Sequence, residues 1–373
     1  MRMREIATRS FRFLAVLFLV AGAASGVAPL AAAQAEAPAA ARGPAASFST
    51  SGALTGVAAI SATNIWAVGS TGTGKALILH WNGKTWTRVP SPGGALHAVA
   101  ATSATNVWAV GSTANGNALI VRWNGRVWTP VPSPAPAGSA FYGVAATSAR
   151  SAWAVGSTKK GKGLIERWNG QVWAQMPGPA FSAGFLSSVA ATSASNAWAV
   201  GSAGNKTLII HWNGKAWKQV PSPSPQSNTG LADFLDGVAV TSSGSAWAAG
   251  DISCGCGPGF SLVERWNDHA WKQVPSPTLG GGTVMFSVAA LSERNVWIAG
   301  ATGSGDGPTK TMILRWNGTA WHRMPTPSPG ASAELSGVIA TSADNAWAVG
   351  STSNVLHGSS QTLILRWNGT TWK

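Results

Sequence analysis

Cysteine, tyrosine and acidic residues are scarce in this chain of 373 residues. It has 2 Cys, 1 Tyr and 12 Asp plus Glu, against 26 Lys plus Arg. Few carboxylates argue against a glycoside hydrolase, because that chemistry needs a pair of Asp or Glu side chains at the substrate. Two thiols cannot complete a structural zinc site, which takes four ligands. We therefore expect no enzyme active site, no metal site and no cofactor.

The two cysteines stand together as Cys254-Gly255-Cys256. Export to an oxidising compartment would favour a disulfide between them. Asp251 lies nearby in the sequence and leaves a metal site as the weaker alternative. The remaining acidic residues of interest are Asp233, Asp236, Glu166 and Glu264. We interpret Asp233 and Asp236 as solvated loop residues, and the alternative is that they serve an extracellular hydrolase or lyase.

Long apolar runs are also lacking, except near the N-terminus. A segment with four Arg residues precedes a short apolar run, Phe13 to Ala24, and residues 31–33 are three Ala residues before Gln34. This order is typical of a secretory signal peptide, and the run is too short for a membrane span. We predict a signal peptide over residues 1–33, an Ala/Pro/Ser-rich linker over 34–51, and one folded domain over 52–373. The mature protein is then secreted and extracellular.

The shortage of acidic residues leaves a formal net charge of +14. Such an excess suits anionic partners, such as wall polymers or nucleic acid, but it also keeps a secreted protein soluble. Lys and Arg are scattered through the sequence and not clustered, which favours the solubility interpretation. Nucleic acid is not an expected partner of an exported protein.

What the sequence does contain is a repeat built on tryptophan. The segment Trp-Asn-Gly-x-x-Trp first occurs at residues 81–86, and each copy follows a leading Trp: Trp66, Trp108, Trp153, Trp198, Trp247, Trp297 and Trp347. Seven such triplets account for all 21 Trp residues. The leading Trp recurs after 42 to 50 residues, and periods in this range are typical of propellers and solenoids.

Each repeat divides into four short runs with the composition of strands. In the second repeat they are residues 98–101, 106–110, 119–123 and 128–131. The first run consists mainly of Gly, Ala and Val, which suits an innermost strand where blades converge. We predict an all-β fold, a seven-bladed β-propeller with four antiparallel strands per blade. A solenoid is the alternative, but it needs capping repeats with polar outer faces, which this sequence does not show.

The Asn-Gly pairs predict tight hairpins between the third and fourth runs. We predict a two-residue type I′ turn at Asn82-Gly83, with both residues at positive φ and Leu79 opposite Trp86. Leu79, Trp81 and Trp86 then share one buried face. The fifth repeat has Asn267-Asp268 instead, and since Asp adopts positive φ less readily than Gly, its turn should be the weakest.

The connections of such a ring fall on two faces. Turns after the first and third runs repeat almost unchanged and define what we call the constant face. Connections after the second and fourth runs vary in length and composition and define the variable-loop face. Binding sites usually lie on variable loops held by a rigid scaffold, so we expect any site there. Residues 46–54 are expected to close the ring by adding a strand to the seventh blade.

One position at the start of the first run differs from repeat to repeat. Its residues are Thr55, His97, Tyr142, Ser187, Asp236, Phe286 and Ser336. One explanation is an asymmetric ligand at the mouth of the channel, and the other is drift at an unconstrained site. The sequence does not separate them. The aromatic residues in or beside the variable connections favour a ligand: Phe141, Tyr142, Phe181, Phe185 and Phe234.

A basic residue precedes every Trp-Asn pair: His80, Arg122, Arg167, His211, Arg265, Arg315 and Arg366. A ring of seven such residues could bind anions. The favoured alternative is structural, with each cation stacked on a neighbouring Trp, or paired with Glu166 and Glu264 beside Arg167 and Arg265.

The pattern Trp-Ala-Val-Gly followed by Leu-Ile-x-Arg-Trp-Asn-Gly-x-x-Trp resembles tectonin-type propeller repeats, which occur in carbohydrate-binding lectins. It is closer to secreted bacterial repeat proteins with the same Trp-Asn-Gly signature. The resemblance covers about residues 54–373 and implies a propeller. The blade count and the spacing between the first two Trp residues differ from tectonin repeats, so no sugar-binding residues are carried over. The Gly-x-Thr-Trp ending at residues 83–86 half-matches the Asp-box of sialidase-like propellers, but Trp81 replaces its Asp.

We therefore predict a secreted, non-enzymatic propeller that acts as a binding or scaffold module. A cell-surface carbohydrate or protein is the expected partner, and the protein is expected to be a monomer. The alternative is an extracellular glycoside hydrolase or lyase that uses carboxylates of the variable-loop face.

Overall fold

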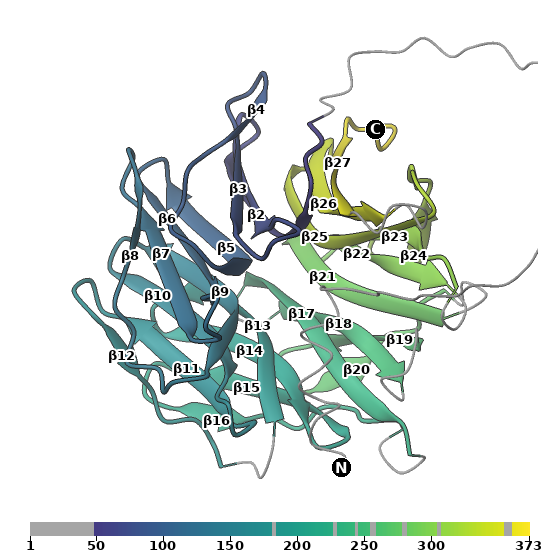
Figure 1. Cartoon of the computed structure of the whole chain (residues 1–373). Helices are drawn as coiled ribbons and strands as arrows, with labels where there is room; N and C mark the ends of the chain where they lie inside the picture. The colour runs from purple at the N-terminus through teal and green to yellow at the C-terminus, as the bar shows by residue number, and fades with distance from the viewer. Residues whose placement is uncertain are drawn as a thin grey trace, which may run out of the picture.

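The structure, a computed structural model, describes residues 48–180, 184–226, 230–242, 245–253, 259–277, 282–303, 307–353 and 360–373. Over these ranges the chain forms seven antiparallel sheets, six of four strands and one of three. The inner strand of each sheet contacts the inner strands of both neighbouring sheets, so the sheets form a closed ring of blades (Figure 1). The predicted all-β seven-bladed propeller is confirmed. In the described ranges no helix has the length and apolar character needed to cross a membrane.

Each blade runs from its inner to its outer strand in chain order. The first three blades are β1–β4 (Ala53–Ser61, Asn64–Ser70, Ala76–Trp81, Trp86–Arg88), β5–β8 (Ala95–Ser103, Asn106–Ser112, Ala118–Trp123, Trp128–Pro130) and β9–β12 (Ala140–Ser148, Ser151–Ser157, Gly163–Trp168, Trp173–Gln175). The next three are β13–β16 (Gly184–Ser193, Asn196–Ala203, Lys206–Trp212, Trp217–Gln219), β17–β20 (Ala232–Ser242, Ser245–Ser253, Phe260–Trp266, Trp271–Gln273) and β21–β24 (Gly282–Ser292, Asn295–Gly303, Lys310–Trp316, Trp321–Met324). The seventh is β25–β27 (Ser332–Ser342, Asn345–Ser353, Ser360–Trp367). Its fourth strand is reduced to one bridge between Trp367 and Trp372.

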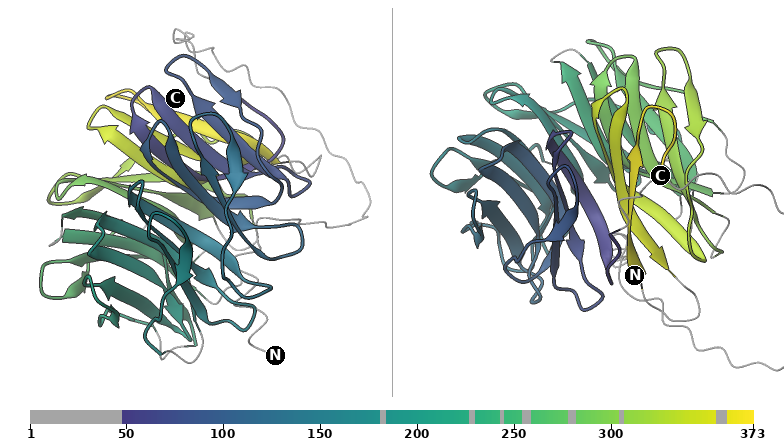
Figure 2. Two further views of the ribbon diagram at one scale, coloured as in Figure 1. Left: turned by 90° about the vertical axis from the view of Figure 1, so that its left-hand side faces the viewer. Right: turned by 90° about the horizontal axis from the view of Figure 1, so that it is seen from above.

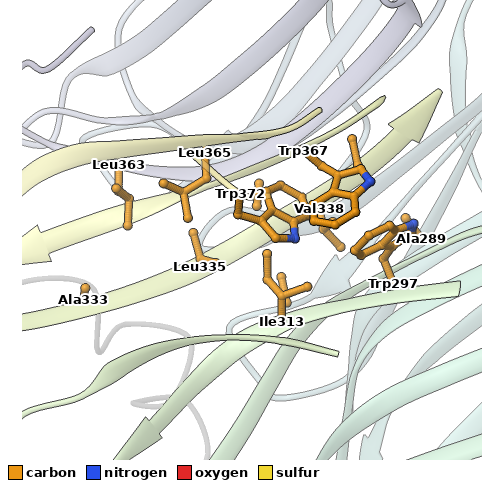
Figure 3. Packing of buried hydrophobic residues seen from close by; sticks show 13 residues of the cluster. Ala289, Trp297, Ile313, Ala333, Leu335, Val338, Leu363, Leu365, Trp367 and Trp372 are labelled. Carbon is orange, nitrogen blue, oxygen red and sulfur yellow. The ribbon is translucent and has the colours of Figure 1, made fainter. Parts of the chain in front are cut away.

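Tryptophan side chains join each blade to the next. The leading Trp of a blade is at most 2% exposed and packs on both Trp residues of the following hairpin. Trp297, for example, lies with its ring centroid 5.5 Å from those of Trp367 and Trp372, edge-on to the second (Figure 3). The same contacts recur at every boundary. Each buried Trp removes roughly 150–250 Å² from water, so the Trp set is the main component of the core.

Ring closure uses the same contact. Trp347 of the last blade packs on the first blade, 5.1 Å from Trp81 and 5.4 Å from Trp86 between ring centroids. Figures 1 and 2 show the purple first blade beside the yellow last blade. The seventh boundary, which no inter-blade connection spans, is therefore packed like the six that the chain crosses.

The N-terminal segment of the propeller also pairs with the last blade, as expected from the sequence. Gly52 N–H donates to the carbonyl of Ser360 at 2.9 Å, and Thr362 N–H donates to the carbonyl of Thr50 at 2.9 Å. Thr50 N–H donates in turn to the Thr362 hydroxyl at 3.1 Å. In blade four the equivalent Thr207 bonds instead to the segment that follows the blade's own fourth strand. The N-terminal residues thus take the place of that segment in blade seven.

The hairpin register differs from the prediction. Trp81 pairs directly with Trp86 across a four-residue loop, and Leu79 pairs with Arg88. Asn82 Oδ1 accepts hydrogen bonds from the backbone N–H groups of the last two loop residues, at 3.0 and 2.9 Å. The Asn side chain therefore closes the loop, and only the glycine that follows adopts positive φ. Leu79 and both Trp residues still share one buried cluster, so the predicted common face is confirmed.

The fifth hairpin carries the departure noted in the sequence. Asp268 has a φ of 75° and is the one non-glycine residue with positive φ in the described ranges. Glycine occupies this position in the other six hairpins, where it adopts φ values between 92° and 104°. The left-handed conformation is unfavourable for Asp, so this turn carries a local cost that the others lack.

Candidate functional site

The seven variable residues occupy one structural position. In every blade the register between the inner strand and the second strand shifts at this residue, which makes it the extra residue of a β-bulge. They are Thr55, His97, Tyr142, Ser187, Asp236, Phe286 and Ser336, and all lie near the variable-loop end of the inner strand. A bulge residue has no partner in the ladder, and bulges often redirect a side chain beside a site. We call these residues the bulge ring.

A glycine on the second strand permits each bulge. Gly69 pairs with Leu54 beside the bulge, and a Cβ on Gly69 would collide with the carbonyl oxygen of Ala53. The equivalent glycines meet an equivalent carbonyl: Gly111, Gly156, Gly201, Gly250, Gly300 and Gly350. The Gly of the repeated Trp-x-x-Gly segment is therefore a sequence signal for the bulge, which the sequence analysis missed.

Two members of the bulge ring bind the neighbouring blade. Thr55 Oγ1 donates to the carbonyl of Leu96 at 2.8 Å, and His97 Nδ1 donates to the carbonyl of Phe141 at 2.7 Å. Burial lowers the pKa of His97, which keeps its imidazole neutral at pH 7 with the proton on Nδ1. At these two blades the variable residue has a structural role, so neither of the two sequence explanations covers the whole ring.

His97 and Tyr142 form an aromatic pair between the second and third blades. Their ring centroids lie 5.6 Å apart at an interplanar angle of 30°. The Tyr142 hydroxyl lies 3.2 Å from Ser157 Oγ, within hydrogen-bond distance, and the residue is half-buried. Asp236 and Phe286 of blades five and six are also half-buried, and each makes contacts of its own. The bulge ring thus places aromatic and polar side chains together both at blades two and three and at blades five and six.

The other aromatic residues expected near the site belong elsewhere. Phe141 is fully buried and Phe234 is 5% exposed, both within the core. Phe185 is half-buried and packs on Phe234 with ring centroids 6.4 Å apart. Phe181, like Cys254 and Cys256, lies outside the described residues, so the disulfide stays a prediction. The described residues contain no group of three or more His, Cys, Asp or Glu side chains suited to a metal ion.

The basic residues before Trp-Asn stack on the leading Trp of their own blade. The guanidinium carbon of Arg315 lies 4.6 Å from the ring centroid of Trp297, and four other Arg residues do the same at 4.9 to 5.2 Å. His80 and His211 stack at 4.2 Å. The structural alternative is confirmed. Pairing of Arg265 with the adjacent glutamate is wrong, because Arg265 contacts Glu293 of the next blade at 3.2 Å.

The acidic residues do not form the pair that the sequence suggested. Asp233 is fully buried and Asp236 is half-buried in the bulge ring, and both lie within β17, so the prediction of solvated loop residues is wrong for both. Glu264 is also fully buried, and the charge of Asp233 adds to burial in raising its pKa to about 8. Burial raises the pKa of Asp233 as well. This pair lies inside the boundary between blades four and five, where a substrate has no access.

Glu166 is the counterpart of Glu264 in blade three. It is fully buried, accepts a hydrogen bond from Ser133 Oγ at 2.9 Å, and burial raises its pKa to about 7. Both glutamates pair with an Ala of the second strand, at a position that is aliphatic in the other blades: Leu79, Val121, Ile210, Leu314 and Leu365. This alignment was the signal for burial.

No protein-family model and no curated protein matches the chain. Solved structures with a similar fold include YCF48 bound to a D1 peptide, at 17% identity with a TM-score of 0.56, covering 86% of this chain and 94% of that chain. The WD40 β-propeller domain of Doa1 shares 13% identity with a TM-score of 0.57, covering 84% and 92%. A virginiamycin B lyase from Staphylococcus aureus shares 15% identity with a TM-score of 0.57, covering 84% and 97%. At these identities the likeness concerns the fold alone.

Proposed function

We propose that this protein is an exported, non-catalytic β-propeller that binds carbohydrate at the bulge ring on its variable-loop face. The observation that carries the proposal is a contrast along the inner strands. The bulge position holds six residue types in seven blades, whereas the residue before it is Leu in five blades, with Phe141 and Met285 in the other two, and the residue after it is always Gly, Ala or Ser. A position that changes at every blade of a repeated scaffold suits one asymmetric ligand lying across the ring.

Sugars fit the side chains present. The pair of His97 and Tyr142 offers an aromatic surface beside hydrogen-bonding groups, and Asp236 supplies a carboxylate on another side of the ring. Small-molecule sites usually combine an apolar surface with a few polar groups that orient the ligand. The buried positions of Asp233, Glu166 and Glu264 support a non-catalytic role, because these carboxyls cannot reach a ligand.

Two other candidate functions are suggested by the proteins with similar structures. The peptide in the YCF48 structure makes a peptide the second ligand class to test here. The lyase among the similar structures keeps an extracellular hydrolase or lyase as the alternative activity. A glycan array, a peptide array and a screen for glycoside hydrolase and lyase activity separate the three.

The residue test compares the two faces of the ring. Tyr142→Ala and Asp236→Ala should each weaken the binding of an array-identified glycan by at least about 1 kcal/mol, roughly fivefold. Lys84→Ala, at an exposed turn of the constant face, is the control and should leave binding unchanged. If Lys84→Ala weakens binding and the other two substitutions do not, the assignment of the site to the variable-loop face is wrong. Turnover of a glycan by the wild type would replace the binding proposal with catalysis.

Export and oligomeric state are part of the proposal. Mass spectrometry of the protein from the medium should give an N-terminus at Gln34, and size-exclusion chromatography with light scattering should give a monomer. Protein retained in the cells with an intact N-terminus would contradict export.

A further inference from the structure

We infer that the cleft between the first and second blades is a second binding site, one that takes the acid groups of an anionic polysaccharide. This inference rests on the proposed carbohydrate binding and names a ligand class that the bulge ring does not specify. The cleft has a volume of about 630 Å³ and opens on the variable-loop face. It is lined by residues 73–76 of blade one, by residues 88–94 without Pro92, and by residues 113–115 of blade two.

The cleft exists because this boundary is filled less than others. Residues 89–94 form the shortest connection between two blades. In blades four and six, the hydroxyls of Thr207 and Thr311 hold the longer connections against the third strand. The equivalent residue in blade one is Ala76, which has no hydroxyl and lines the cleft. A Cβ on Gly93 would meet no atom within 4 Å, which confirms open space at this connection.

The charge of the cleft has one sign. Its two ionisable lining residues are Lys75, in the connection before β3, and Arg88, at the end of β4, and both are exposed. None of the thirteen lining residues is acidic. The remaining polar groups are hydroxyls and an amide, from Thr73, Ser91, Thr113 and Asn115. Two cations among neutral hydrogen-bonding groups suit a carboxylated or sulfated sugar.

The described part of the variable-loop face also carries an excess of positive charge. Six lysines are exposed on its described connections and strand ends: Lys75, Lys159, Lys160, Lys162, Lys206 and Lys310. The exposed carboxylates of the described residues are Asp268, Glu293 and Asp344, and all three lie at turns of the constant face. The expectation that basic residues are merely scattered is therefore incomplete, because the exposed carboxylates of the described residues lie on the opposite face and Asp236 and Glu334 on this face are half-buried. Such a field attracts polyanions over about 8 Å at physiological salt.

A polysaccharide fits better than an acidic peptide. The apolar lining consists of Val89, Pro90 and small residues, and it contains no aromatic ring or deep apolar wall. Peptide recognition usually depends on apolar anchor side chains held in such pockets. Sugar hydroxyls, in contrast, can use the Thr, Ser and Asn groups of the cleft.

The experiment measures the affinity of the purified full chain for polygalacturonate, heparin, neutral dextran and poly-L-glutamate, at salt concentrations from about 0.05 to 0.5 M. The test variant is Lys75→Gln/Arg88→Gln. The control is Lys84→Gln/Arg126→Gln, which removes one Lys and one Arg from exposed turns of the constant face in the same two blades. A third variant, Gly93→Phe, fills the cleft without changing the charge.

Polygalacturonate, heparin or both should bind and dextran should bind more weakly. The test variant should lose roughly 5- to 30-fold in affinity, as expected for two exposed ion pairs, and the control less than about twofold. Gly93→Phe should also weaken binding. Polygalacturonate against heparin shows whether carboxylate or sulfate is preferred.

Other results would contradict the cleft site, the class of ligand or the proposed function. Equal losses in the test and control variants, with Gly93→Phe unaffected, would show nonspecific attraction and refute the cleft site. Equal binding of poly-L-glutamate with the same variant dependence would replace the polysaccharide with an acidic peptide. Binding of neutral glycans through Tyr142, with no preference for acidic ones, would refute the cleft and leave the proposed function intact. Binding of neither acidic polysaccharide would refute the cleft site, and the absence of any ligand on the glycan array would refute the proposed function.

Discussion

Glu264 and Glu166 should make this protein less stable as the pH rises from neutral to alkaline. Both side chains are fully buried at positions where the other blades have Leu, Ile or Val. Neither oxygen of Glu264 has a hydrogen-bond partner among the residues that the structure describes, and Asp233 adds a second buried carboxyl beside it. Ionising such a group inside a core is unfavourable, so the folded state holds its proton.

The sign and size of the change in the free energy of unfolding with pH follow from the pKa values. Burial raises the pKa of Glu264 to about 8 and that of Glu166 to about 7, from 4.5. The folded protein therefore binds more protons than the unfolded chain from pH 4.5 to about 8, and the free energy of unfolding falls as pH rises through this window. At about 1.4 kcal/mol per pKa unit, the two groups together lower it by roughly 2–3 kcal/mol between pH 6.5 and 9.

Histidines do not obscure this window. Burial lowers the pKa values of His80, His97 and His211 below 6.5. The unfolded chain binds protons at these sites more readily than the folded one, so they reduce stability as the pH falls through 6.5, and this effect is nearly gone at about pH 7.5 and above. Above that pH the buried carboxyls determine the slope, and the raised pKa values of Asp233 and Glu334 act in the same direction.

The assay is urea denaturation followed by Trp fluorescence at about pH 6.5, 7.5, 8.5 and 9, analysed by linear extrapolation. Glu264→Leu should raise the free energy of unfolding by about 2–3 kcal/mol at pH 8.5. In this variant the decrease in the free energy of unfolding from pH 6.5 to 9 should be only about 1 kcal/mol. Glu293→Gln, which removes an exposed carboxylate, should leave the slope of the wild type unchanged. A wild-type stability that is flat from pH 6.5 to 9, or a destabilised Glu264→Leu, would refute the reasoning.

Three further outcomes test the ring itself. Trp347→Ala and Trp198→Ala should each lower the free energy of unfolding by about 3–5 kcal/mol, and a much smaller loss for Trp347 would show that closure is not part of the cooperative unit. Deleting residues 49–51 removes three hydrogen bonds to blade seven, two of Thr50 and one of the Ser49 hydroxyl to Gln361, and should lower the melting temperature by roughly 3–6 °C by differential scanning calorimetry, with no shift as the contrary result. Asp268→Gly should raise the free energy of unfolding by about 0.5–1 kcal/mol, and a loss would contradict the strain assigned to that turn.

The position of the proposed site could be predicted from the sequence, but the β-bulge at that position could not. Alignment of the repeats found the variable position of Tyr142 and Asp236, because a repeated scaffold gives every blade the same frame. The bulge that frees this position depends on how the inner and second strands pair, although Gly69 and its equivalents were a visible trace of it. The hydrogen bonds of Thr55 and His97 reach carbonyls of the next blade, more than forty residues away in the chain, and composition carries no record of them.

The sequence by itself determined the strands, the blade number and the ring, because these depend on local patterns that recur seven times. Tertiary structure decided what each patterned residue contacts. Asn82 acts through its side chain and not through positive φ, since the two backbone N–H groups of its loop need an acceptor. Glu264 is buried because a blade packs over its strand face, and the cleft beside Ala76 is open because a short connection leaves that boundary unfilled. Such outcomes depend on which surfaces meet across blade boundaries, and a periodicity that describes one blade contains no information about the distance to the next.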